Sequence, residues 1–488
     1  MLHIAIVHHH LRGGGITRVI GNAWEALRDR NVRIAVLVGE PPSAEIPNGL
    51  TVKVVPGLGY ANCANATGAP TDASGLLSRV KAAARDALGR APDVWHVHNH
   101  SLGKNPVVTH AVHALALEQA PLLLQIHDFP EDGRPANYRA LADDLRQLAA
   151  AEGLKCLYPA GARVHYALLN QRDAQALSQA GLAEGRRHVL PNAVYLESSP
   201  GSAVDRAEDF IVYPTRAIRR KNLGEFLLWA VSALDFRFAV TLAPKNPDAR
   251  PGYDSWVRFA EKAALPVTFE FGGHTDLSFP QVLASAAAVG TTSVGEGFGL
   301  AFLEPWLAGT PVIGRDLPDI TRDFTDHGID LNPLYERLDV PLEWVGEHAL
   351  RDAFARDMAR SWESYGRELT AEGVDRALAS AVQDGTTVDF GRLDEPLQKR
   401  ALTALQGDRD LQLTLRGRVL DGMHAGRALA ERNVALVRGH FGLNAYGDKL
   451  QALYQTVADS PADSPQSLDP QRVLDAFLDP TSFMLLRT

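Results

Sequence analysis

Two carboxylates with seven residues between them, Glu296 and Glu304, could together hold a hydroxyl-rich ligand. They lie in the segment SVGEGFGLAFLEPWLAGTPVIG, residues 293–314. The glycines after Glu296 let the backbone approach a ligand closely, and Pro305 is tolerated only in the first turn of a helix. We therefore expect one acid in a loop and the other at the mouth of a helix. Each carboxylate could accept two hydrogen bonds from a vicinal diol; the alternative is a helix cap and a solvated loop acid.

Basic residues follow a predicted strand in VYPTRAIRRKNLGEF, residues 212–226. The guanidinium group binds phosphate oxygens in pairs, and a lysine adds a point charge. The helix expected after these residues adds the positive end of its dipole. A charge cluster is usually a solvated surface, but the position at the carboxyl end of a strand favours a diphosphate site. The cluster consists of Arg216, Arg219, Arg220 and Lys221.

A glycine loop, HHHLRGGGITRVI at residues 8–20, joins the first predicted strand to the first predicted helix. Glycines at this point let backbone N–H groups approach an anion. Gly13 and Gly15 fit the start of a dinucleotide fingerprint, and Glu40 ends the second strand as a ribose-binding acid would. Arg18 replaces the third glycine of that fingerprint. A phosphate contact, a tight turn and an NAD-linked oxidoreductase all stay open here.

Histidines recur at the ends of the next strands. In DVWHVHNHS, residues 93–101, alternation predicts that His96, His98 and His100 face one way. An H-x-H at a strand end can bind a metal, as in a metal-dependent hydrolase using His96, His98 and His127. Histidines at this rim more often line a ligand crevice, which is the interpretation we favour. Further metal ligands would come from His8, His9, His10 and Asp128.

The loop after the fourth strand, within LLLQIHDFPEDGRPANYR at residues 122–139, is rich in hydrogen-bonding groups. Such a loop suits an anionic or hydroxyl-rich ligand, and the alternative is a helix-capping loop. Lys104 would add charge on the same side of the domain. We predict a small anionic acceptor, such as a sugar acid or a phosphate ester. The loop residues concerned are Arg134, Asn137, Tyr138 and Arg139.

Strand and helix patterns alternate twice along the chain, which predicts parallel sheets with helices on both faces. The first series begins at LHIAIVHH and the second at FIVYPT, residues 210–215. Between them, residues 188–210 have the composition of a linker. Residues 345–435 look almost entirely helical, with no evident strand, and two further helices are predicted on either side of Gly442.

Composition narrows the class of protein. The chain has 488 residues, 45% of them hydrophobic, which is enough for two or three globular domains. A formal net charge of -9 gives no support to nucleic-acid binding. Cys63 and Cys156 form no disulfide framework, so we expect a reducing, cytoplasmic location. No stretch reaches the length of a transmembrane segment. A homodimer is possible, and the sequence does not set the oligomeric state.

In their order along the chain, these features resemble the retaining GT-B glycosyltransferases of family 4, which use nucleotide-sugar donors. The resemblance covers roughly residues 1–330 and the final helices. The E-x7-E segment with GTPVIG after it is specific, whereas the glycine loop is not. The motifs that carry it are the glycine loop, HD at 127–128, PNA at 191–193, R-x4-K at 216–221 and EGFGLAFLE at 296–304.

The resemblance implies a fold and a division of the chain. The fold is α/β: two Rossmann-like doubly wound domains face a cleft, and a C-terminal helix returns to the N-terminal domain. The acceptor-binding domain would span residues 1–203 and the nucleotide-sugar-binding domain 204–445, with a helical insertion at about 345–435. Residues 446–488 would form the returning helix.

The resemblance also implies roles for single residues. Arg216 and Lys221 would neutralise the donor diphosphate, and His127 would contact the sugar near its reacting face. Glu296 would hold the transferred sugar, and Glu304 would bind the ribose. The backbone at Phe298, Gly299 and Leu300 would contact sugar hydroxyls, and Gly14 and Gly15 would approach the diphosphate.

The implied reaction moves a hexose from a nucleoside-diphosphate sugar, with UDP or GDP most expected, to a small soluble acceptor. The anomeric configuration is retained, and no metal or cofactor is required. A phosphorylase or sugar synthase of the same fold is the alternative. Three departures from the family bear on the substrate more than on the reaction: PNAVY at 191–195, Asp319 in place of a Glu, and the long helical segment.

Overall fold

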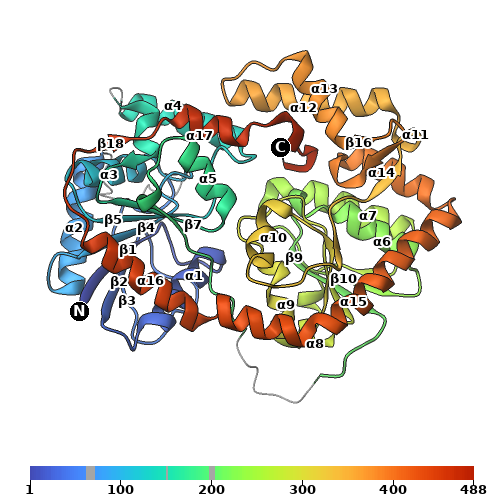
Figure 1. Cartoon of the computed structure of the whole chain (residues 1–488), viewed down its shortest axis with the longest axis horizontal. Helices are drawn as coiled ribbons and strands as arrows, with labels where there is room; N and C mark the ends of the chain where they lie inside the picture. The colour runs from blue at the N-terminus through green and yellow to red at the C-terminus, as the bar shows by residue number, and fades with distance from the viewer. Residues whose placement is uncertain (62–71, 150–151, 197–203, 488) are drawn as a thin grey trace. The chain divides into compact units, whose positions relative to one another are not determined.

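The computed structural model describes residues 1–61, 72–149, 152–196 and 204–487 (Figure 1). It divides into two compact units, each with its own core. The first unit contains Met1–Ala193, Ser364–Arg367 and Phe441–Leu478, and the second contains Val194–Glu363, Glu368–His440 and Asp479–Thr488. The predicted domain boundary after residue 203 falls among residues 197–203, outside the described part of the chain.

The first unit is built on a seven-stranded parallel sheet with the order β3-β2-β1-β4-β5-β7-β8. β1 lies between β2 and β4, so the strand order reverses there, as in Rossmann-like domains. The predicted doubly wound α/β fold is thus confirmed for this unit. The strands are β1 (Leu2–Val7), β2 (Val32–Val38), β3 (Thr51–Val54), β4 (Val94–His98), β5 (Leu122–Ile126), β7 (Val164–Leu168) and β8 (Arg187–Val189).

Both faces of this sheet are buried because its strands are nearly continuous apolar runs. Alternate residues of β1 enter different cores: Ile4 and Ile6 pack on one face, Ala5 and Val7 on the other. The first face is covered by α1 (Gly15–Leu27) and α16 (Leu443–Ala458). The second face is covered by α2 (Ala73–Leu88), α3 (Pro106–Leu117), α4 (Pro135–Leu148), α5 (Gln171–Gln179) and α17 (Pro470–Phe477).

The chain returns to the first unit near its end, as predicted. The long helix α15 (Arg409–Phe441) ends directly before Gly442, and α16 begins directly after it. The predicted break at Gly442 is therefore confirmed. The return ends at Leu478, however, and the last ten residues belong to the second unit.

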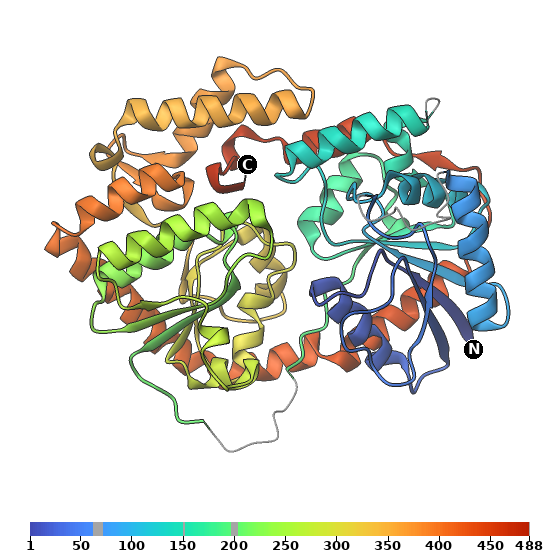
Figure 2. The same cartoon turned by 180° about the vertical axis from the view of Figure 1, so that it is seen from behind.

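The second unit has a six-stranded sheet with the order β11-β10-β9-β12-β13-β14, seen from behind in Figure 2. Its pairs are parallel, which confirms the second Rossmann-like series. The strands are β9 (Phe210–Arg216), β10 (Arg237–Leu242), β11 (Val267–Thr268), β12 (Ala288–Thr291), β13 (Val312–Arg315) and β14 (Leu334–Tyr335). The helices beside them are α6 (Leu223–Ser232), α7 (Arg250–Lys262), α8 (Phe279–Ser285), α9 (Glu304–Leu307) and α10 (Pro318–Thr325).

The segment at 345–435 is mostly helical, but the prediction that it contains no strand is wrong. β16 (Val382–Gln383) and β17 (Thr387–Asp389) form an antiparallel hairpin, and β15 (Asp339–Pro341) pairs with β17. Asp384 and Gly385 both have positive φ, 51° and 68°, in the turn between the strands. An Asp-Gly pair before a β-branched run is a hairpin signal that the sequence did contain. The helices here are α11 (Leu342–Val345), α12 (Glu347–Ser364), α13 (Ala371–Ala381), α14 (Glu395–Leu405) and α15.

A buried ion cluster joins this small sheet to the large one. Arg315, at the end of β13, is 1% exposed. Its Nη2 lies 2.7 Å from Glu225 of α6 and 2.7 Å from Asp389 of β17. The Tyr335 hydroxyl donates to Glu225 at 2.9 Å. A Cβ on Gly391 would lie 2.5 Å from Cζ of Arg315, so the hairpin end must carry a glycine there.

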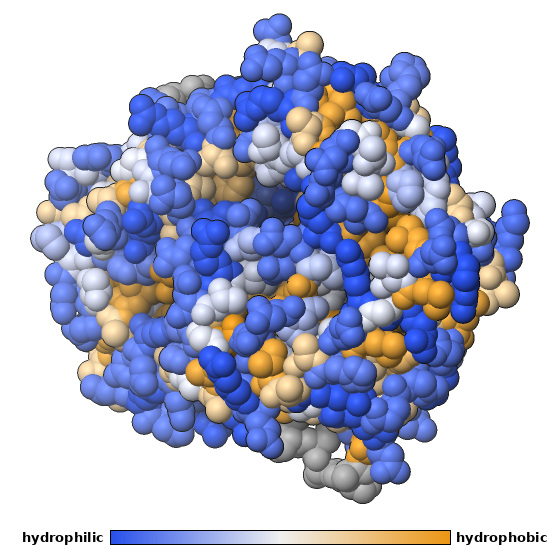
Figure 3. Space-filling model, turned by 45° about the vertical axis from the view of Figure 1, so that its right-hand side comes forward, coloured by the Kyte–Doolittle hydropathy of each residue, from blue (hydrophilic) through white to orange (hydrophobic). Residues whose placement is uncertain are grey.

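In the described residues, no helix is both long and apolar enough to cross a membrane. One face of the molecule is drawn in Figure 3, where hydrophilic residues predominate and apolar side chains occur in small patches.

Candidate active site

Glu296 lies in a cage of basic side chains at the carboxyl end of the second unit's sheet. Its side chain is 9% exposed, and its Oε1 is paired with Nζ of Lys221. Its Oε2 is 3.4 Å from Nη1 of Arg220, which also donates to the Gly295 carbonyl. The structure therefore brings the first acid of the E-x7-E segment and the basic cluster together. Sequence reasoning placed both at one rim but did not predict this direct pairing.

The charged groups around Glu296 shift one another's pKa values. Burial opposes ionisation of Glu296, but Lys221 and Arg220 outweigh it and lower the pKa of the carboxyl group. Burial lowers the pKa of Lys221, and Arg220 adds to this, while Glu296 acts against it. The carboxylate thus stays charged, and the lysine is crowded by a like charge. An additional anion would stabilise both cations.

The four basic residues of the cluster have different partners. Arg216, at the end of β9, donates from Nη1 to the Ala243 carbonyl at 3.1 Å. Arg219 pairs with Glu395 of α14 at 2.7 and 2.9 Å. Of the four, Arg220 and Lys221 form ion pairs with Glu296. The sequence does not reveal the role of Arg219, because its partner lies 176 residues away.

Glu304 begins α9 and is 7% exposed. Pro305 is in the first turn, and Gly309 after the helix has φ of 68°. The predicted helix start and helix end are confirmed. Phe298 packs in the core, 5.5 Å from the Phe324 ring, so only its backbone can face a ligand.

Gly299 precedes a 3₁₀ turn, Leu300–Phe302, that leads into α9. Its φ is 89°, and an added Cβ would lie 2.8 Å from the Phe302 ring. A side chain at Gly299 is therefore excluded by both backbone conformation and packing. This glycine holds the backbone between Glu296 and Glu304 in its bend.

In the first unit, the glycine loop leaves open space before α1. A Cβ on Gly13 or Gly15 would have no neighbour within 4 Å, and one on Gly14 would have only a carbonyl at 3.9 Å. Packing within the protein thus does not require glycine at these positions, whereas close approach of an anion does. Glu40, the acid of the NAD alternative, instead pairs with Arg12 at 2.7 Å. That pairing weakens the dinucleotide interpretation.

His127 follows β5 and lies in a buried group of histidines. Its Nε2 is 2.9 Å from Nδ1 of His98, and the rings stack with centroids 5.2 Å apart. His96 and His98 stack at 4.4 Å, as their alternation predicts. His96 is held between the Tyr454 hydroxyl at 2.7 Å and Gln125 at 2.9 Å.

Asn99, which sequence reasoning missed, orients this group. Its φ is 51°, and its side-chain oxygen accepts from the backbone N–H of His127 at 2.7 Å and of Asp128 at 3.3 Å. A left-handed Asn after a strand leaves no distinct signal in the sequence. It fixes the direction in which the chain leaves β5.

The hydrolase alternative needs a set of metal ligands at these histidines. Within the residues that the structure describes, no group of three or more His, Cys, Asp or Glu side chains could hold a metal ion. The ring nitrogens of His96 are used by Tyr454 and Gln125, and Nδ1 of His98 is used by His127. The geometry thus fits mutually hydrogen-bonded imidazoles.

Burial keeps these imidazoles neutral. It lowers the pKa of His96 to about 3, and that of His9, His100 and His127 to about 4. The unfolded chain binds protons below a pH of about 6.5, whereas the folded rings stay neutral until roughly pH 4. Stability should therefore fall as pH falls through this window, by up to about 1.4 kcal/mol per pH unit for each ring.

This predicts the effect of His96→Gln on the pH dependence of stability. Urea unfolding at pH 7, 6 and 5 gives the free energy of unfolding at each pH. In His96→Gln this free energy should fall less steeply with falling pH, by up to about 1.4 kcal/mol per pH unit. His348→Gln is the matched control, because the His348 side chain is 91% exposed. An unchanged slope in His96→Gln would show that this ring is protonated equally in the folded and unfolded chain.

The four predicted acceptor residues divide into two groups. Lys104 and Arg134 belong to one charged group with Asp128, which pairs with Nη2 of Arg134 at 2.6 Å. Burial lowers the pKa of Lys104, and the charge of Arg134 adds to the effect. Asn137 donates to the Leu102 carbonyl. Tyr138 is 3% exposed, and burial raises its pKa to about 12, so the structure assigns its side chain to packing.

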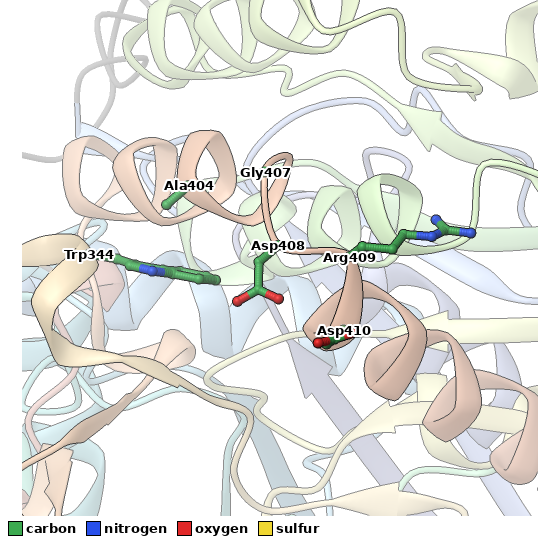
Figure 4. A pocket seen from close by; sticks show the side chains of 6 residues that line it. All are labelled: Trp344, Ala404, Gly407, Asp408, Arg409 and Asp410. Carbon is green, nitrogen blue, oxygen red and sulfur yellow. The ribbon is translucent and has the colours of Figure 1, made fainter.

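A surface hollow lies elsewhere in the second unit, among α11, α14 and the start of α15 (Figure 4). The Trp344 ring and the Asp408 carboxylate point toward one another across it. Asp408 and Asp410 both line the hollow, and the lining includes none of the predicted site residues. The lining residues are Trp344, Ala404, Gly407, Asp408, Arg409 and Asp410.

Known proteins resemble this chain in sequence and in fold. No family model matches the sequence. Mannosylglucosyl-3-phosphoglycerate synthase of Petrotoga mobilis is 28% identical over 353 residues, which are 66% of this chain and 66% of the relative. The chain thus matches just under two thirds of that protein's length.

Among solved structures, HepE of Anabaena in complex with UDP and glucose matches with a TM-score of 0.52 at 13% identity. The match covers 93% of this chain and all of HepE. Sucrose-phosphate synthase of Thermosynechococcus elongatus matches with a TM-score of 0.51 at 13% identity, and the match covers 94% of this chain and 99% of that one. These similarities, with the two parallel sheets, show the GT-B glycosyltransferase fold.

Proposed function

We propose that this chain is a retaining glycosyltransferase that moves a hexose from a nucleoside-diphosphate sugar to a hydroxyl of a small anionic acceptor. One observation carries the proposal: Glu296 is held between Lys221 and Arg220 at the carboxyl end of a parallel sheet. The acid can bind sugar hydroxyls, and the bases can bind a diphosphate. The GT-B fold and the E-x7-E spacing support placing both functions at this point.

In this proposal, the residues of the second unit act on the donor. Arg216, Arg220 and Lys221 bind the diphosphate, and Glu296 accepts hydrogen bonds from the hexose. Glu304 accepts hydrogen bonds from the ribose diol. The backbone at 298–300 contacts the sugar. In the first unit, the open loop at Gly14 and Gly15 has room for an anion beside its backbone N–H groups.

The proposed reaction exchanges one bond to the anomeric carbon for another. The bond from that carbon to the diphosphate oxygen breaks, and a bond to the acceptor oxygen forms on the same face. The acceptor's hydroxyl proton passes to the departing phosphate oxygen. Basic side chains stabilise the negative charge that develops on the diphosphate, so positioning and electrostatics supply the rate enhancement. His127, kept neutral by burial, would contact the hexose.

The acceptor side rests on the first unit. Lys104 and Arg134 can bind a carboxylate or phosphate. The relative from Petrotoga mobilis is named for a product that contains a glucosyl phosphoglycerate, which is such an anion. We therefore propose a phosphorylated sugar acid of this kind as the acceptor class. The same name also fits the sugar-synthase alternative, which would share the donor chemistry.

A donor and acceptor screen tests the proposal. The purified chain is incubated with UDP-glucose, GDP-mannose or ADP-glucose and with glucosyl 3-phosphoglycerate or its neutral analogue glucosylglycerol. We expect turnover with one donor and the anionic acceptor, and NMR of the product should show retention. Thermal stabilisation by NAD alone would contradict the proposal. Turnover from a glycoside and inorganic phosphate without nucleotide would instead favour a phosphorylase.

Lys104→Met tests the acceptor assignment separately. Loss of a charge-assisted contact should raise KM for the anionic acceptor about 10-fold, with little change in kcat. KM for the neutral acceptor should not change. Lys81→Met is the matched control, because Lys81 of α2 pairs on the surface with Glu118, the residue directly after α3. An equal change in KM for both acceptors would contradict charge recognition by Lys104.

A further inference from the structure

The last residues of the chain fold back on the second unit and are held there at several points. Ser380 donates to the Thr481 carbonyl at 2.9 Å, and Arg392 donates to the Phe483 carbonyl at 2.8 Å. The Phe483 ring packs 5.7 Å from Trp362. Leu485 and Leu486 are buried. This segment is therefore an ordered part of the second unit.

This anchoring places Arg487 over the loop that carries Glu296. A Cβ on Gly295 would lie 2.9 Å from Nε, 3.1 Å from Cδ and 3.2 Å from Cζ of Arg487. The guanidinium group thus occupies the space that any side chain at position 295 would need. The 3₁₀ turn of residues 485–487 also packs against the turn of residues 219–221.

Three cations consequently meet at the Gly295–Glu296 peptide. Arg220 donates to the Gly295 carbonyl, Lys221 pairs with Glu296, and Arg487 lies against Gly295. They come from two segments more than 250 residues apart in the chain. The charge of Arg220 disfavours the charged form of Lys221, as like charges do when they lie close together. A multiply charged anion at this point would relieve the repulsion.

We propose that Arg487 is a third cationic ligand of the donor diphosphate, supplied by the C-terminal segment. This rests on the proposed function, since the ligand class is a nucleoside diphosphate or its sugar ester. The planar guanidinium group can bind two phosphate oxygens at once, which Lys221 cannot do. Arg487 would also stabilise the charge that develops when the sugar leaves. Gly295 is then required because it admits this side chain.

Calorimetric titration of the full-length chain tests the proposal. Wild type, Arg487→Ala and Arg487→Lys are titrated with UDP, GDP and ADP and with the nucleosides uridine, guanosine and adenosine. We expect Arg487→Ala to weaken binding of the preferred diphosphate about 10- to 100-fold and to leave nucleoside binding unchanged. Arg487→Lys should lie between the two. Arg237→Ala, which loses an exposed pair with Asp209 at the other end of the sheet, is the matched control.

Each other outcome has a definite meaning. If wild type binds no diphosphate, the proposed function fails and this inference fails with it. If wild type binds a diphosphate and Arg487→Ala binds it equally well or more tightly, the inference is overturned and the proposed function stands. A third outcome is that Arg487→Ala weakens diphosphate and nucleoside binding equally and that Arg487→Lys does the same. Arg487 then only supports the loop, and the inference is overturned. A melting temperature measured for each variant identifies any that fails to fold, and Arg487→Lys then decides the test.

Discussion

Replacing Glu296 with Gln should reduce kcat by about 100- to 1000-fold, the range found when a group that stabilises the transition state is removed. The amide keeps the size of the side chain but loses its charge. It can no longer neutralise Lys221 and Arg220. It also accepts fewer hydrogen bonds from the transferred sugar. Steady-state rates with the donor found in the screen measure this change.

The control for Glu296→Gln is an acid of the same unit outside the cage. Glu343→Gln, at an exposed position in α11, should keep the wild-type rate. Both variants should keep a wild-type far-UV spectrum, and their melting temperatures show whether the chain stays folded. A Glu296→Gln enzyme within about threefold of wild type would refute the assignment of this residue, since a directly contacting charged group contributes more than that.

Replacing Arg315 with Met should lower the free energy of unfolding by about 3–5 kcal/mol. The substitution leaves Glu225 and Asp389 buried without the cation that holds both. Burial raises the pKa of Glu225 even when Arg315 is present, so its loss would force that carboxyl group further toward the neutral form. Urea unfolding of the full chain at pH 7 measures the effect.

Two further variants separate the ion cluster from a general effect of losing an arginine. Arg237→Met removes a pair with Asp209 in which both side chains are more than half exposed, and such pairs contribute about 1 kcal/mol or less. A triple variant, Arg315→Met with Glu225→Leu and Asp389→Leu, should regain part of the lost stability, because no buried charge then lacks a partner. If Arg315→Met lowers the free energy of unfolding by less than about 1 kcal/mol, the ion cluster does not hold the small sheet to the large one as we infer.

Much of the fold could be predicted because its signals are local. Continuous apolar runs predict the buried parallel strands, and the alternation with helices predicts two doubly wound sheets. Pro305 sets the start of α9, and Gly442 separates α15 from α16. The β16–β17 hairpin was missed because its strands are only two and three residues long, although Asp384–Gly385 marks its turn.

The candidate site was predicted only in part. The sequence indicates that Glu296 and Lys221 lie at one rim, since both follow neighbouring strands of one sheet. It does not reveal that Asn99 orients His127, or that Arg219 pairs with Glu395 of α14 and not with Glu296. It also suggests Tyr138 as a ligand group, whereas packing buries the ring against Tyr365. Each of these depends on a partner distant in the chain or on a backbone angle.

The sequence by itself determined the two α/β series and the residue types at the carboxyl ends of their strands. The periodicity of apolar residues, the residues that begin and end helices, and the order of strands and helices along the chain can all be recognised in short stretches of sequence. Only the tertiary structure decided which charges meet. Lys221 faces Glu296, Arg315 joins Glu225 to Asp389, and Arg487 of the C-terminal segment lies against Gly295. Such pairings follow from how distant segments pack, and a charged residue's local sequence is compatible with a solvated surface as well as with a buried partner.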